Sequence, residues 1–164
     1  TDAAGNAHAR SPQNPIYLLN QAQLALIKKD TTSALDSIKQ ALVLKPNYID
    51  AFVLRAQIRS SLGQTDAPVE ELTAYTKVAP SDEQGFLLLG QAYTTARQYP
   101  KAINAYNQAS QLAPLDPTPR INAINVMILM GNTDQAIETL NAFKTQFPNV
   151  TGVDEKISIV IYCC

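Results

Sequence analysis

The chain has 164 residues, of which 46% are hydrophobic, and its formal net charge is −1. A chain of this length and hydrophobic content can bury the core of one domain. Its near-zero charge gives no field to attract nucleic acid or an anionic membrane, so neither is an expected partner. No run of about 20 apolar residues is present, and we expect no direct membrane insertion by this segment.

The chain opens with a polar segment, TDAAGNAHARSPQN, that shows no periodicity. We predict a polar arm over residues 1–14, because such a composition buries too little apolar surface to fold alone. Since the sequence does not start with Met, we expect a processed product or an excised segment. Asn14 is expected to cap the first helix, with Pro15 at its first position.

Four helical pairs are predicted after this arm. The first runs over about 15–45 with its turn at 29–31, and the second over about 49–79 with its turn at Gly63. In the second pair we expect Asp66 to cap the second helix, so that Pro68 lies harmlessly in its first turn. The acidic pair Glu70 and Glu71 is expected on an outer helix, facing solvent.

The third pair, over about 82–113, shows the clearest pattern. Apolar residues recur at helical spacing on both sides of a break at 98–99: Phe86, Leu89 and Tyr93, then Ala102, Tyr106 and Ala109. Two apolar stripes separated by a break predict two amphipathic helices folded against each other. Gly90 and Ala102 are small enough for close approach of the two backbones.

The fourth pair is expected to start with Asp116 capping a helix that begins at Pro117, to turn at 131–132 and to end near Phe147. Beyond it, residues 149–164 form a capping or assembly segment. Its apolar sequence, ISIVIYCC, predicts either a fifth inner helix covered by another molecule or an extended strand that pairs with something. The helix is the favoured of the two.

The four pairs are in register. Four prolines, each 34 residues after the previous one, end the successive units: Pro46, Pro80, Pro114 and Pro148. Matching offsets carry Ala34, Pro68, Ala102 and Ala136, then Ile38, Leu72, Tyr106 and Leu140. This pattern resembles the tetratricopeptide repeat, with units of about 15–48, 49–82, 83–116 and 117–150. The resemblance implies an all-α fold, a right-handed α-solenoid (superhelix) of stacked antiparallel helical hairpins.

The resemblance also implies that ligand contacts come from fixed positions on the first helix of each pair, which lines a concave groove. Three columns follow from those positions: apolar Leu19, Val53, Leu87 and Ile121; amides Gln23, Gln57, Gln91 and Asn125; and, between them, Asn20, Leu54, Leu88 and Asn122. An amide offers both a donor and an acceptor, so a row of amides could bracket the backbone of an extended peptide. The groove is predicted to be neutral.

Residues for catalysis are scarce. His8 is the only histidine and lies in the polar arm, so no Ser/His/Asp or Cys/His arrangement is expected. Cys163 and Cys164 are adjacent, which matches no zinc-binding spacing. We therefore predict a protein that is not an enzyme and that has no cofactor and no metal.

Three functions are considered. The first is a protein–protein interaction scaffold that binds a peptide or partner protein in the groove. The second is a structural protomer that self-assembles into filaments end to end, through Ile157, Val160, Ile161, Cys163 and Cys164. The third is an accessory domain of a larger envelope enzyme. A charged fraction of 16%, the sequon at Asn149 and the terminal cysteines favour an extracytoplasmic or extracellular location.

Overall fold

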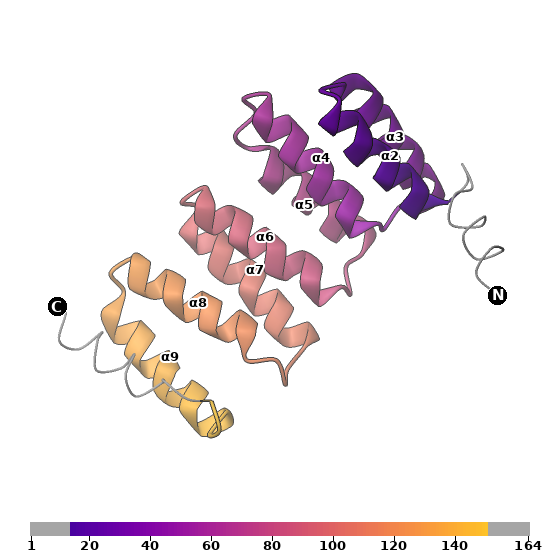
Figure 1. Ribbon diagram of the computed structural model, residues 1–164. Helices are drawn as coiled ribbons and strands as arrows, with labels where there is room; N and C mark the ends of the chain where they lie inside the picture. Colours follow the sequence, from indigo (N-terminus) through magenta and orange to yellow (C-terminus); the bar gives the residue numbers. More distant parts are fainter. Residues whose placement is uncertain (1–13, 151–164) are drawn as a thin grey trace, which may run out of the picture. The chain divides into compact units, whose positions relative to one another are not determined.

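The computed structural model describes residues 14–150, and these form eight α-helices and no strand (Figure 1). The prediction of an all-α fold is therefore confirmed. The chain divides after Pro80 into two compact units, an N-terminal unit and a C-terminal unit. Each unit holds two helical hairpins and is described by itself.

The N-terminal unit contains α2 (Pro15–Ile27), α3 (Thr31–Leu44), α4 (Ile49–Ser61) and α5 (Ala67–Val78). Helices α2 and α3 form the first hairpin, and α4 and α5 form the second. One core joins α2, α3 and α4, and its buried members are Leu18, Leu19, Ala22, Ala34, Ile38, Ala41, Tyr48, Ala51 and Ile58. The small residues in this set allow the helix backbones to approach closely.

The sequence predicted the cap of α2. The Asn14 side chain accepts a hydrogen bond from the Ile16 N–H at 2.9 Å, and Pro15 follows at the start of the helix. The prediction for α5 was wrong in one respect. Asp66 precedes the helix, but its side chain makes no capping hydrogen bond. Its backbone is already helical, with φ −85° and ψ −5°, whereas a capping residue is normally extended and so aims its side chain at the free N–H groups.

The C-terminal unit contains α6 (Glu83–Thr95), α7 (Tyr99–Leu112), α8 (Thr118–Leu129) and α9 (Thr133–Gln146). Helices α6 and α7 form the third hairpin, and α8 and α9 form the fourth. Its core has two clusters, one between α7 and α8 with Ala102, Tyr106, Ala123 and Val126, and one between α8 and α9 with Ile124, Leu140 and Phe143.

The start of α8 differs from the prediction by one residue. The helix begins at Thr118 instead of Pro117. Asp116 nevertheless accepts a hydrogen bond from the Thr118 N–H at 2.9 Å, and hydrogen bonds from the Thr118 side chain and from this N–H lower the pKa of the Asp116 carboxyl. Asp116 therefore satisfies an N–H group of the first turn of α8 from a position two residues earlier in the chain.

The turn between the two helices of every hairpin contains one residue with a positive φ. These four residues are also 34 positions apart, and they are Lys29 (φ 61°), Gly63 (89°), Arg97 (56°) and Gly131 (74°). A left-handed backbone is easy for glycine but costs an L-residue roughly 1–2 kcal/mol. The first and third turns therefore hold strain that the second and fourth turns avoid.

We expect Lys29→Gly and Arg97→Gly each to raise the free energy of unfolding by about 0.5–1 kcal/mol, because glycine relieves the left-handed strain but adds entropy to the unfolded chain. Urea unfolding followed by far-ultraviolet circular dichroism would measure the change. Gly63→Ala is the matched control and should destabilise, since a Cβ at Gly63 would meet no atom within 4 Å and only backbone strain is added. Loss of stability in both glycine variants would show that these turns are not strained.

Candidate functional site

The predicted apolar column contributes mainly to packing. Leu19 is 7% exposed and belongs to the core of the N-terminal unit. In the C-terminal unit, Leu87 and Ile121 are half-buried and pack against the two core clusters. Val53 is also half-buried. These side chains therefore offer a ligand little apolar surface.

The predicted amide column lies largely at the surface. Gln23, Gln57 and Gln91 are exposed, and Asn125 is half-buried. In the third column, Asn20 is exposed and Asn122 is half-buried, whereas Leu54 packs against the core of the N-terminal unit. Gln23, Gln57 and Gln91 are thus the predicted site residues of the amide column that the fold leaves most available for hydrogen bonds with a ligand.

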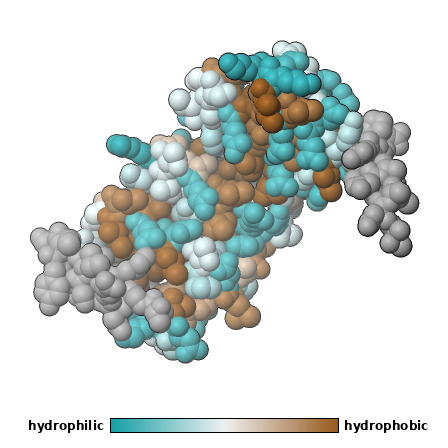
Figure 2. Space-filling model, viewed as in Figure 1, coloured by the Kyte–Doolittle hydropathy of each residue, from teal (hydrophilic) through white to brown (hydrophobic). Residues whose placement is uncertain are grey.

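The structure adds apolar surface that the sequence columns did not include. On α2, Ile16 is 58% exposed and Ile27 is 80% exposed, and Leu24 lies between them at 48%. These residues do not occupy the core positions that recur every 34 residues. This mismatch was the signal in the sequence that could have identified them as exposed. Figure 2 shows hydrophobic surface beside hydrophilic surface at the end of the N-terminal unit where α2 meets α3.

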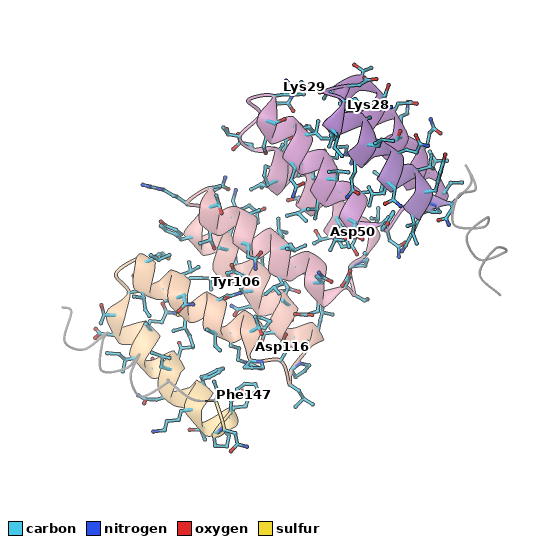
Figure 3. The ribbon with its side chains drawn as sticks, viewed as in Figure 1. Lys28, Lys29, Asp50, Tyr106, Asp116 and Phe147 are labelled. Carbon is cyan, nitrogen blue, oxygen red and sulfur yellow. The ribbon has the colours of Figure 1, made fainter. Side chains whose placement is uncertain are left out.

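Charged side chains lie at the two ends of the N-terminal unit. Lys28 and Lys29 are exposed at the α2–α3 turn, and Asp50 is exposed in the first turn of α4, at the opposite end of the hairpins (Figure 3). Asp30 is next to the lysines, but it accepts hydrogen bonds from the Ser33 hydroxyl and N–H, which lower the pKa of its carboxyl. Asp30 is thus already engaged in capping α3.

The second hairpin contains an ionic network that the sequence analysis missed. Glu71 was expected to face solvent, but it is 5% exposed and lies between α4 and α5. Arg55 donates to its Oε2 from Nη2 at 2.6 Å and from Nε at 2.8 Å, and Arg59 donates to its Oε1 at 2.8 Å. Arg59 also donates to Glu70 at 2.6 Å, and these two carboxylates raise the pKa of the Arg59 guanidinium. Glu71 can be buried because both of its carboxylate oxygens accept hydrogen bonds from the arginines.

The third hairpin has apolar residues at the positions of this network. Leu89, Tyr93 and Ala105 are 34 residues after Arg55, Arg59 and Glu71, respectively. They help to line a cavity of about 240 Å³ between α6 and α7, together with Phe86, Lys101, Asn104 and Gln108. The sequence signal for the network was the presence of arginines at two positions that are apolar in another repeat.

The described residues offer no sign of a metal site or a membrane span. Within 14–150, no group of three or more His, Cys, Asp or Glu side chains could hold a metal ion. None of the helices in this range is both long and apolar enough to cross a bilayer. The predicted assembly residues, from Ile157 to Cys164, lie outside the described part of the chain.

Two family models, both described as tetratricopeptide repeat, match residues 53–117 and 93–151. Together they span residues 53–151, which is more than half of the chain and extends from within α4 to beyond α9. The chain belongs to the tetratricopeptide repeat family. The family assignment supports a protein–protein interaction scaffold in general terms.

One relative is the small glutamine-rich tetratricopeptide repeat-containing protein 2 of Mycosarcoma maydis, which is 28% identical over 90 residues. The match covers 55% of this chain but 26% of that protein. The chain therefore spans about a quarter of this tetratricopeptide repeat relative.

Solved tetratricopeptide repeat structures have the same fold. A crystal structure of MamA matches with a TM-score of 0.66 and 18% identity, covering 92% of this chain and 82% of that one. The structure of YrrB, described as a tetratricopeptide repeat protein with an unusual peptide-binding site, matches with a TM-score of 0.62 and 17% identity. That match covers 96% of this chain and 81% of YrrB.

Proposed function

We propose that this chain is a non-enzymatic interaction scaffold that binds a peptide segment of a partner protein along the first helices of its hairpins. The observation that carries the proposal is the column of amides, with Gln23 and Gln57 exposed in the N-terminal unit and Gln91 exposed in the C-terminal unit. Each amide can both donate to and accept from a peptide backbone, so amides that recur along the chain can pair with the regularly spaced N–H and C=O groups of a peptide. The peptide-binding site described for YrrB is consistent with this use of the fold.

The column of amides itself is uncharged. Helix α2 contains no charged residue and α6 has only Glu83 in its first turn, whereas α4 carries Asp50, Arg55 and Arg59 and α8 carries Arg120. Arg55 and Arg59 are paired with Glu70 and Glu71, and Arg120 donates to the Pro114 carbonyl, so we expect the uncharged amides to make the hydrogen bonds with a ligand along the helices. Recognition would then depend on backbone hydrogen bonds and on apolar contacts with the neighbouring side chains.

End-to-end assembly is the alternative, and one observation weighs against it. Of the seven positions of the first hairpin that are equivalent to those around the cavity of the third hairpin, two are apolar, Leu18 and Ala25, and five are polar, namely Gln21, Ser33, Asp36, Ser37 and Gln40. An end contact through this face would have to bury polar groups, which is unfavourable unless each finds a partner. We therefore place peptide binding ahead of filament formation and of a role as an accessory domain of a larger envelope enzyme.

Selection from a random peptide library on the immobilised chain tests the proposal. Peptides that bind should lose about tenfold or more in affinity to the double variant Gln23→Ala with Gln57→Ala, because a backbone hydrogen bond is worth about 1 kcal/mol and two are removed. The same loss is expected for Gln91→Ala with Asn125→Ala if the ligand contacts the C-terminal unit.

The matched control is Asn107→Ala with Gln111→Ala, which removes two exposed amides from α7, the second helix of its hairpin. Fluorescence anisotropy with the selected peptides would measure all the affinities. Equal affinity for the inner-helix and control variants would overturn the proposal, as would a library that yields no binding peptide.

A further inference from the structure

One face of α2 is uncharged, exposed and continuous. Ile16, Asn20, Gln23 and Ile27 are spaced by four, three and four residues, so they lie on one face of the helix. All four side chains are exposed. The face therefore has an apolar residue at each end and two amides between them.

The two ends of this surface have opposite charge. Lys28 and Lys29 follow Ile27 directly at the turn end. At the other end, Asp50 on α4 holds the position that Ile16 holds on α2, and the exposed Lys45 at this end is engaged with the Tyr48 ring, its Nζ 4.6 Å from the ring centroid (Figure 3). An uncharged surface between a positive and a negative end selects a ligand with the reverse polarity.

We propose that the N-terminal unit binds an extended, dipolar segment of a partner protein, with a basic residue against Asp50, apolar residues in the middle and an acidic residue against Lys28 and Lys29. This inference rests on the proposed function and specifies its ligand. Helix α2 has 13 residues. At 1.5 Å per residue it is about 20 Å long, and an extended chain covers that distance in about six residues at roughly 3.3 Å each. The two charges of the ligand are therefore about six residues apart.

The amides favour an extended ligand over a helical one. A helix satisfies its own backbone N–H and C=O groups, except at its ends. An extended segment leaves these groups free, and Asn20 and Gln23 can pair with them. Ile16 and Ile27 then contact apolar side chains of the ligand at the two ends of the same face.

Four labelled synthetic peptides of about eight residues test the charge pattern. All share a middle of alternating Leu and Ser, and their ends are Lys and Glu, Lys at both ends, Glu at both ends, or Gln at both ends. We expect the Lys–Glu peptide to bind the full chain about fivefold or more tightly than the other three, since each exposed ion pair is worth up to about 1 kcal/mol. Fluorescence anisotropy at low salt measures this order.

Charge reversal on the protein provides the decisive control. Asp50→Lys should shift the preference to the peptide with two Glu ends, and Lys28→Glu with Lys29→Glu should shift it to the peptide with two Lys ends. Ile16→Ser with Ile27→Ser should weaken all four peptides without changing their order. Circular dichroism would confirm that each variant is folded.

The outcomes separate this inference from the proposed function. An order of peptides that does not respond to charge reversal would overturn the dipolar ligand, even where library peptides still depend on Gln23 and Gln57. Library peptides that ignore those amides would overturn the proposed function as well.

Discussion

Replacing Glu71 with alanine is expected to lower the free energy of unfolding by about 2–3 kcal/mol. The substitution leaves Arg55 and Arg59 without their shared carboxylate between α4 and α5. Breaking a buried ion pair typically costs 3–5 kcal/mol, but these arginine side chains are 29% exposed and water can solvate them in part, which reduces the loss. Urea unfolding would measure the effect, and amide hydrogen exchange would locate it in α4 and α5.

A triple variant distinguishes the cost of leaving the arginines unpaired from the loss of a network that stabilises the hairpin in its own right. Arg55→Leu, Arg59→Met and Glu71→Ala replace the network with residues that other hairpins carry at the equivalent positions, namely Leu89, Met127 and Ala105. Apolar replacement of a complete buried network is often neutral or stabilising, so this variant should recover most of the stability lost in Glu71→Ala. A triple variant less stable than the single one would show that the ions stabilise the hairpin in their own right.

The second large effect is expected for Gly90→Ala, which should destabilise the chain by about 1–3 kcal/mol through overpacking between α6 and α7. A Cβ at Gly90 would lie 2.5 Å from Cε1 and 2.6 Å from Cδ1 of Tyr106. The Tyr106 ring is 3% exposed and belongs to the core of the C-terminal unit, so it has little room to move. The better helix propensity of alanine offsets up to about 1 kcal/mol of this cost.

Other hairpins show how the same contact is made with a Cβ present. Ala56 and Leu72 hold the positions of Gly90 and Tyr106 in the second hairpin, and Ala22 and Ile38 hold them in the first. Tyr106→Leu should therefore rescue Gly90→Ala, and a double-mutant cycle from urea unfolding should give a favourable coupling energy. Simple additivity of the two changes would contradict the contact between Gly90 and the ring.

The sequence alone determined the repeat, the helices and most of their ends. The 34-residue recurrence of Pro46, Pro80 and later prolines is a local property, since a proline disfavours helical geometry in the residue before it wherever it occurs. The cap at Asn14 is equally local, because it depends on neighbouring backbone groups. The amide column followed from the same period, which assigns equivalent positions without knowledge of contacts.

Only the tertiary structure decided how much surface each of these positions keeps. Glu71 is buried because two arginines from the preceding helix reach it, and no rule based on residue type predicts such pairing. Leu19 lies in the core while Ile27 on the same helix is 80% exposed, although both are aliphatic residues. Periodicity gives the direction of a side chain from its own helix, whereas burial depends on which neighbouring helix covers that direction.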